Sequence, residues 1–181
     1  MMKKIAVLAM SLLLILCALG GAAAETETTE TAKTEIGVLN VNGAFSIQSR
    51  IPEGYTYTPL TNTSLNITGI LTGGEGQPMV TVSIAYNETY ADMERFNDVD
   101  EATVQEIRDS FLQADPEVTF EDLETAYGTR LLKVTGKRFV DIYTMYKSYE
   151  VEFVMAGGTI TDEDIRMMVD FISDMDFVTV E

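Results

Sequence analysis

The amino-acid sequence predicts an α+β fold, in which two main helices pack on a mostly antiparallel sheet. In residues 79–86 apolar and polar side chains alternate, which indicates a strand with one wet face and is typical of antiparallel sheets. The segments 139–145 and 149–155 predict a hairpin. Two more segments, 99–114 and the stretch that begins at Thr161, repeat apolar residues at helical spacing.

Strand signals recur along the chain, and turn residues separate them. Asn42-Gly43, a strong hairpin signal, follows the first of them, and the glycine-rich residues 73–76 end the third. The expected strands are 36–41, 45–48, 65–70, 79–86, 117–120, 131–134, 139–145 and 149–155. In the last of these, one face holds Tyr149, Val151, Phe153 and Met155, and the other face holds Glu150 and Glu152.

Both predicted helices begin with capping signals. Asp98 and Glu101 resemble a capping box ahead of the first helix, and Thr161 with Asp164 forms the same pattern ahead of the second. Each helix then carries an apolar stripe on one side. The stripe residues are Val104, Ile107 and Phe111 in the first helix and Ile165, Met168, Val169 and Ile172 in the second.

The N-terminus predicts export. Residues 1–24 combine a basic start, an uncharged apolar run and an Ala-x-Ala ending, which together indicate a removable signal peptide. Two alternatives stay open: residues 5–24 could be kept as a membrane anchor, or Cys17 could be lipidated. We therefore expect a secreted or cell-envelope protein, attached to a membrane only under these alternatives.

Residues 25–35 are rich in threonine and glutamate, and we expect them to form a disordered acidic tether. A single α+β domain is expected over residues 36–181, without internal repeats. A chain of this size can bury roughly 70% of its unfolded surface, so one core suffices without disulfides.

The composition excludes several chemistries. The 181 residues include no histidine and one cysteine, which the predicted cleavage removes, so His-dependent triads, Cys–His nucleophiles and typical zinc or copper sites are excluded. A net charge of −17 argues against nucleic-acid partners and favours cations or basic proteins. The same charge also keeps an exported protein soluble.

Two groups of residues are candidate sites. Asp98, Asp100 and Glu101, with Asp92 and Glu94 just before them, could bind calcium through hard carboxylate oxygens. The spacing does not match an EF-hand loop, and the favoured alternative is a helix cap in a solvated loop.

Three tyrosines form the second candidate. Tyr143, Tyr146 and Tyr149 cluster at the last predicted hairpin, where they could contact a protein partner. The favoured alternative is ordinary strand packing.

The chain resembles the PsbP-like family, which includes the extrinsic photosystem II protein and a yeast Ran-binding relative. The resemblance lies in the apolar segment 45–47 followed by Ile-Pro-Glu-Gly-Tyr at 51–55, the glycine-containing strand 127–134, a long hairpin, and a closing amphipathic helix over 161–177. It covers residues 45–177 and implies an α/β/α sandwich. It implies no catalytic or cofactor-binding residue.

The function that we expect is an exported, noncatalytic binding or accessory protein with an unidentified protein or cell-envelope partner. The first alternative is a calcium-binding exported protein. The second is a small carboxylate-dependent hydrolase, which would need two carboxyl groups roughly 5–9 Å apart across a pocket.

Overall fold

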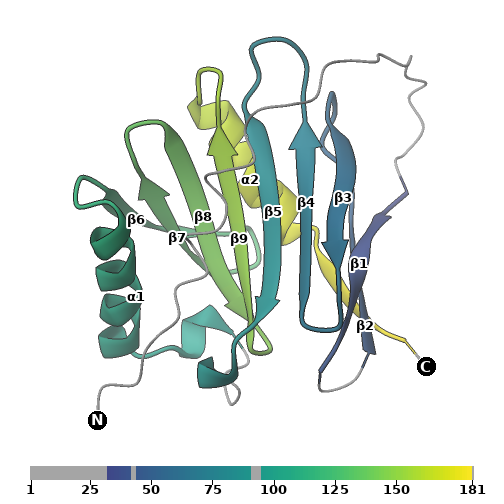
Figure 1. Ribbon diagram of the computed structural model, residues 1–181, viewed down its shortest axis with the longest axis horizontal. Coiled ribbons are helices and arrows are strands. Elements are labelled where there is room, and N and C mark those ends of the chain that lie inside the picture. The colour runs from purple at the N-terminus through teal and green to yellow at the C-terminus, as the bar shows by residue number, and fades with distance from the viewer. Residues whose placement is uncertain (1–31, 42–43, 91–94, 181) are drawn as a thin grey trace.

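The computed structural model describes residues 32–41, 44–90 and 95–180 (Figure 1). The predicted signal segment, 1–24, and most of the predicted tether lie outside the described residues. The strands of the described part are β1 (Thr34–Asn40), β2 (Ala44–Ser49), β3 (Thr56–Asn62), β4 (Asn66–Thr72), β5 (Met79–Tyr86), β6 (Thr119–Glu124), β7 (Arg130–Thr135), β8 (Phe139–Tyr146), β9 (Tyr149–Ala156) and β10 (Asp176–Thr179). The α-helices are α1 (Glu101–Ala114) and α2 (Asp162–Ser173).

The first strand begins before Ile36, the expected start of the domain. β1 pairs with β2 from Thr34, opposite Ser49, so the last two residues of the predicted tether belong to a strand. The Nζ atom of Lys33 lies 2.8 Å from Oδ2 of Asp176. Pairing with β2 extends past the apolar residues of β1, and periodicity alone therefore places the boundary too late.

The strands form two antiparallel sheets in the described part of the chain. The larger sheet has the order β3-β4-β5-β9-β8-β7-β6, and the smaller has the order β1-β2-β10 (Figure 1). This arrangement confirms the predicted α+β class and the antiparallel sheet. The β8–β9 hairpin turns at Lys147 and Ser148, whose φ angles of 47° and 68° suit a tight two-residue turn.

One face of the larger sheet packs against α2 and the smaller sheet. Phe153 of β9 meets Phe171 of α2 edge-on, with 5.4 Å between the ring centroids. Tyr149, Val151 and Met155 are buried in the same core as Phe153, so the predicted apolar face of this strand is confirmed. Each such side chain contributes about 1.5–3 kcal/mol through burial.

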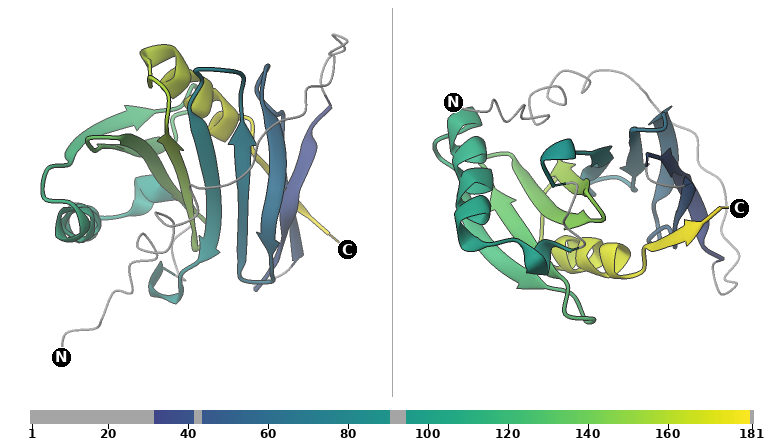
Figure 2. Two further views of the ribbon diagram at one scale, coloured as in Figure 1. Left: turned by 45° about the horizontal axis from the view of Figure 1, so that its top comes forward. Right: turned by 90° about the horizontal axis from the view of Figure 1, so that it is seen from below.

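The opposite face of the larger sheet packs against α1. Val104 and Ile107 of α1 share a second core with Leu132 of β7, Tyr143 of β8 and Phe96. The rings of Phe96 and Tyr143 meet edge-on, 5.5 Å apart at their centroids. The two helices therefore cover opposite faces of one sheet, as the two views in Figure 2 show.

The structure confirms the predicted capping box at one helix and contradicts it at the other. At α2 the predicted capping box is confirmed: the Asp164 N–H donates to Oγ1 of Thr161, and the Thr161 N–H donates to Oδ2 of Asp164. At α1 the predicted box is wrong. Asp100 is the N-cap residue, because Asp98 lies in a 3₁₀ turn, Phe96–Asp98, ahead of the helix.

Two strands lie where periodicity gave no clear signal. β3 is an edge strand with mostly exposed residues, and Pro59 lies beside a register shift. β10 pairs with β2 after α2 has ended at Ser173. Phe177 is therefore a strand residue and not the end of the closing helix.

No α-helix within the described ranges has the length and apolar character that crossing a membrane requires.

Candidate functional site

Two of the three predicted calcium ligands have protein partners in the structure. The Asp100 side chain accepts a hydrogen bond of 2.8 Å from the Thr103 N–H, and this bond lowers the pKa of Asp100. Oε1 of Glu101 accepts a bond of 2.8 Å from Nη1 of Arg130. Asp98 ends the preceding 3₁₀ turn. Two of the three carboxylates therefore take part in a cap and an ion pair, as the favoured alternative requires.

The other two members of this acidic run, Asp92 and Glu94, lie outside the described residues. Among the residues that the structure describes, no group of three or more histidine, cysteine, aspartate or glutamate side chains is arranged to hold a metal ion. Calcium binding by Asp98, Asp100 and Glu101 accordingly stays a prediction.

The three predicted contact tyrosines do not form one surface. Tyr143 and Tyr149 lie in the two separate cores, each with 2% of its surface exposed. Tyr146 is half-buried, and its ring lies 4.2 Å from that of Phe177 between centroids. Tyr143 and Tyr149 are therefore packing residues, because the strand alternation directs them into opposite cores.

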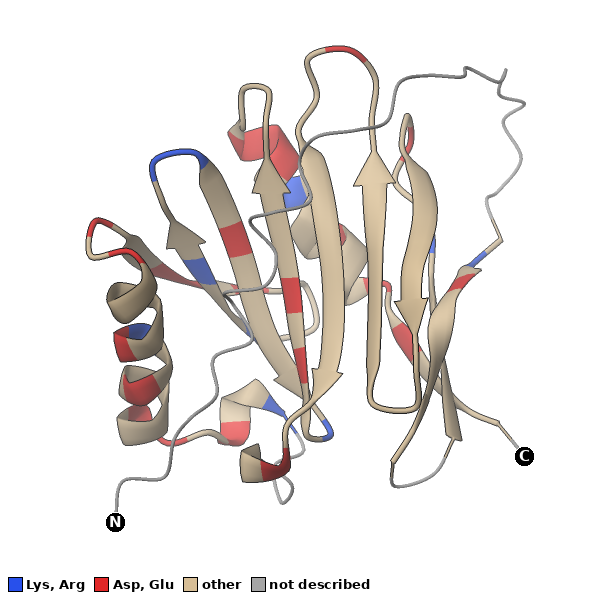
Figure 3. Ribbon diagram, in the orientation of Figure 1, with Lys and Arg blue, Asp and Glu red and all other residues tan. Residues whose placement is uncertain are grey.

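The sheet also brings together three acidic side chains that the sequence did not single out as a site. We call Asp141 of β8 and Glu150 and Glu152 of β9 the carboxylate ladder. The register places Tyr143 opposite Glu152 and Met145 opposite Glu150, so all of these residues share one face. Figure 3 shows acidic segments on the neighbouring strands β8 and β9 within the larger sheet.

Burial changes the protonation of all three ladder residues. Asp141 is 3% exposed, and burial raises its pKa to about 7, against an opposing hydrogen bond from the Phe153 backbone. Burial raises the pKa of Glu152 well above its ordinary value, and the charges of Asp141 and Glu150 add to this effect. Burial also raises the pKa of Glu150, although hydrogen bonds from Tyr143 and Asn87 oppose the rise.

The ladder has no basic counterpart within the described ranges. The nearby sheet residue Arg130 and the α1 residue Arg108 both pair with Asp122, and Lys133 pairs with Glu121. The ion pairs of the described part include none to Asp141, Glu150 or Glu152, and Oδ1 of Asp141 accepts no hydrogen bond. An unpaired buried carboxylate is costly, so the ladder either holds protons or accepts a cation.

Two tyrosine hydroxyl groups stand beside the ladder. The Tyr143 hydroxyl donates to Oε1 of Glu150 over 2.9 Å. Tyr90, from the 3₁₀ turn Glu88–Tyr90, is also buried, and burial with the charges of Glu150 and Glu106 raises its pKa to about 12. Both hydroxyl groups therefore keep their protons at neutral pH, and that of Tyr143 donates to a ladder carboxylate.

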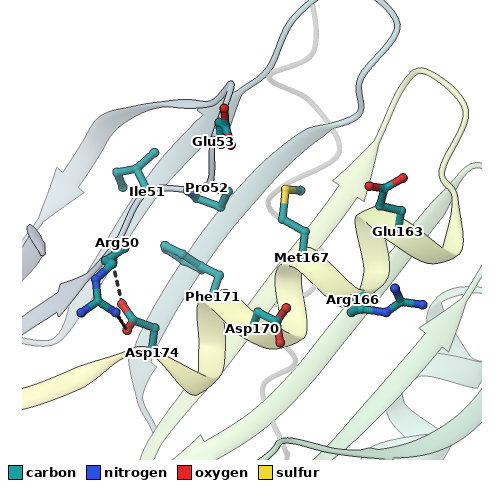
Figure 4. Close-up of a pocket in the computed structure, with 10 residues that line it drawn as sticks. All are labelled: Arg50, Ile51, Pro52, Glu53, Glu163, Arg166, Met167, Asp170, Phe171 and Asp174. Carbon is teal, nitrogen blue, oxygen red and sulfur yellow. Dashed lines mark hydrogen bonds and ion pairs between the residues drawn. The ribbon is translucent and has the colours of Figure 1, made fainter. Parts of the chain in front are cut away.

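A groove lies on the other side of the molecule, between α2 and the chain that follows β2 (Figure 4). Its volume is about 520 Å³. The first wall consists of Arg50, Ile51, Pro52 and Glu53, and the second consists of Glu163, Arg166, Met167, Asp170, Phe171 and Asp174. The groove therefore combines an apolar centre with charged groups along its rim.

Local bonds fix the two walls of the groove. The Arg50 N–H donates to Oδ2 of Asp174 over 2.8 Å, and the Arg50 guanidinium pairs with Oδ1 of the same residue. The Ser49 hydroxyl donates to the Phe171 carbonyl over 3.1 Å. These contacts hold the end of α2 against β2, and Figure 4 shows the Arg50–Asp174 pair at one end of the groove.

Comparison with known proteins found no matching family model, no matching curated protein and no matching solved structure. The carboxylate ladder and the groove are therefore identified as candidate sites from the geometry of the structure alone. The motif at 51–55, which carries the PsbP-like resemblance, contains three of the four residues of the first wall of the groove. The alternation in 149–155 placed Glu150 and Glu152 opposite the core face, yet nothing local indicated that their own face would also be covered.

Proposed function

We propose that this chain is an exported, noncatalytic binding protein whose ligand occupies the groove between α2 and residues 50–53. The observation that carries this proposal is the groove itself, with its volume of about 520 Å³, apolar centre and charged rim. Ligand sites in proteins commonly have volumes of about 300–1,000 Å³ and combine apolar walls with a few polar groups.

The side chains of the groove favour binding over catalysis. They include no hydroxyl, thiol or imidazole group that could act as a nucleophile. Arg50 and Asp174 neutralise each other. Met167 and Phe171 supply apolar contact surface at the centre. We therefore propose that a ligand is held there by apolar contact and charge, while a carboxylate-dependent hydrolase stays an untested alternative.

The charges of the rim favour a cationic ligand. Apart from the Arg50–Asp174 pair, the rim carries Glu53, Glu163 and Asp170 against Arg166 alone. The whole chain has a net charge of −17, which attracts cations over a longer range. We infer that the ligand is a short peptide segment with both apolar and basic residues.

We also propose a PsbP-like relationship and an extracytoplasmic location. Two helices on opposite faces of an antiparallel sheet support the first proposal. One departure from the resemblance is that the closing helix ends at Ser173, with Phe177 in β10. The location is supported by the signal pattern of residues 1–24.

Peptide binding to the purified full chain tests the proposed function. The probe is a fluorescein-labelled peptide of alternating leucine and lysine, and a peptide of alternating leucine and glutamate is its counterpart. Fluorescence anisotropy should show saturable binding of the basic peptide only. Asp170→Lys, an exposed change on the groove side of α2, should weaken binding about tenfold or more.

Asp109→Lys in α1 is the matched control, because Asp109 is also an exposed helical aspartate but lies far from the groove-lining residues in sequence and on the other helix. This variant should bind the basic peptide as the unchanged chain does. Equal weakening by both substitutions would mean that peptide binding depends only on the net charge of the chain, and the groove proposal would then fail.

A further inference from the structure

The carboxylate ladder lies on the face of the larger sheet that is opposite to the α2 core. Phe153 and Val151, which alternate with the ladder residues along β9, point to that core. The ladder is therefore a second site, independent of the groove. An inference about it stands or falls separately from the proposed function.

We propose that the carboxylate ladder of Asp141, Glu150 and Glu152 binds an organic cation through a primary ammonium group. The first support is the missing counter-charge, since no basic side chain of the described ranges pairs with the ladder. The second is Oδ1 of Asp141, which is buried and accepts no hydrogen bond. An ammonium N–H supplies the missing donor and the missing charge together.

The spacing of the ladder suits an ammonium group better than a metal ion. Asp141 is a diagonal neighbour of Glu152 across β8 and β9, and diagonal Cα atoms are about 7–8 Å apart. Among the described residues, no three or more histidine, cysteine, aspartate or glutamate side chains are arranged to hold a metal ion, and this applies to the ladder as well. An ammonium group carries three separate N–H donors and can reach oxygens that do not converge on one metal-sized point.

Two buried tyrosines lie near the ladder. Tyr143 lies on the same face and donates to Glu150, and Tyr90 is close enough for the charge of Glu150 to raise its pKa. Glu150 and Glu152 are only partly buried, so in this proposal the ligand enters past them toward the deeper Asp141.

We expect cation binding at this site to release protons. The ladder holds protons more tightly than free carboxyl groups do, because burial raises the pKa of each member. The facing groups are Tyr143 on β8 and Tyr90 on the 3₁₀ turn, with Glu106 of α1 near Tyr90. A bound ammonium group favours the ionised carboxylates, and the protons leave to the buffer.

Isothermal titration calorimetry of the full chain near neutral pH tests the proposal. The probe is n-butylammonium chloride, and repeating the titration in phosphate and in HEPES gives the number of protons released. We expect saturable binding with net proton release. Asp141→Asn and Glu152→Gln should each weaken binding about tenfold or more, whereas Glu75→Gln in an exposed turn should leave it unchanged.

Two further titrations separate the alternatives. Tetramethylammonium has the same charge but no N–H donor, and calcium chloride tests a metal site. Binding of n-butylammonium alone supports the proposal, and circular dichroism shows that each variant is folded. The proposal is overturned by a lack of saturable heat, by equal binding of tetramethylammonium or calcium, or by unchanged binding in folded Glu152→Gln.

Discussion

Asp141 on β8 and Glu152 on β9 are diagonal neighbours on one face of the larger sheet, and the charge of Asp141 raises the pKa of Glu152. Asp141 is buried and Glu152 is partly buried, so burial disfavours the charged form of each, and the charge of Asp141 adds to this effect at Glu152. A pair of this kind links protonation to folding.

The contribution of Asp141 to stability should fall as pH rises. Its pKa is about 7 in the folded chain against an ordinary 3.8, so the folded chain holds this proton more tightly than the unfolded chain. The contribution is complete below pH 3.8 and is lost as pH rises through about 7. Urea unfolding at about pH 5 and about pH 8 should show a loss on the order of 1–3 kcal/mol from this group.

Asp141→Asn isolates that contribution, because the amide keeps the shape of the side chain and does not titrate. The difference in unfolding free energy between the two chains should therefore change between the two pH values. At the higher pH the variant should be the more stable chain. An identical pH dependence in both chains would show that Asp141 does not hold a proton in the folded state.

Gly69 is required by the ring of Tyr57. A Cβ atom at Gly69 would collide with that ring, whose hydroxyl donates to the Ile36 carbonyl over 3.1 Å. Gly69→Ala should lower the unfolding free energy by about 1–3 kcal/mol, because the ring must move away from this bond. Chemical denaturation measures the loss.

The matched control is Gly74→Ala, since Gly74 is exposed and a Cβ atom there meets only the end of the Gln77 side chain. This change should alter the unfolding free energy by less than about 0.5 kcal/mol. A second substitution, Tyr57→Ala, should make Gly69→Ala nearly neutral. If the cost of Gly69→Ala persists without the ring, the collision is not its cause.

The start of α1 depends on Asp100 rather than on Asp98. Asp100→Ala removes the acceptor of the Thr103 N–H, so its thermal midpoint should fall clearly below that of Asp98→Ala. Asp100→Asn should retain the cap, because asparagine is an equally good N-cap residue. Equal midpoints for the two alanine variants would contradict this assignment.

The same variants test calcium binding. Thermal melts in a chelator and in calcium compare the metal-free and metal-loaded chain, and a ligand specific to the folded state raises the midpoint. Asp100 and Glu101 have protein partners, so we expect no rise. A rise that Asp98→Asn or Asp100→Asn abolishes would instead establish the acidic run as a calcium site.

Elements whose signals are local can be predicted from the amino-acid sequence alone. The capping box at Thr161 and Asp164, the strand β5 and the hairpin of β8 and β9 are all confirmed, although the predicted wet face of β5 is wrong because Ser83 and Ala85 are also buried. Each of them depends on residues a few positions apart, so the pattern of apolar and polar side chains is sufficient to predict it.

Tertiary structure decided what covers each face and each edge. β3 and β10 form because a neighbouring strand supplies their hydrogen bonds, although their own residues are mostly exposed. Glu150 and Glu152 alternate with core residues as the sequence predicts, but packing on the second face of the sheet withdraws them from water. Burial of a polar face depends on segments distant in the sequence, and no local pattern records it.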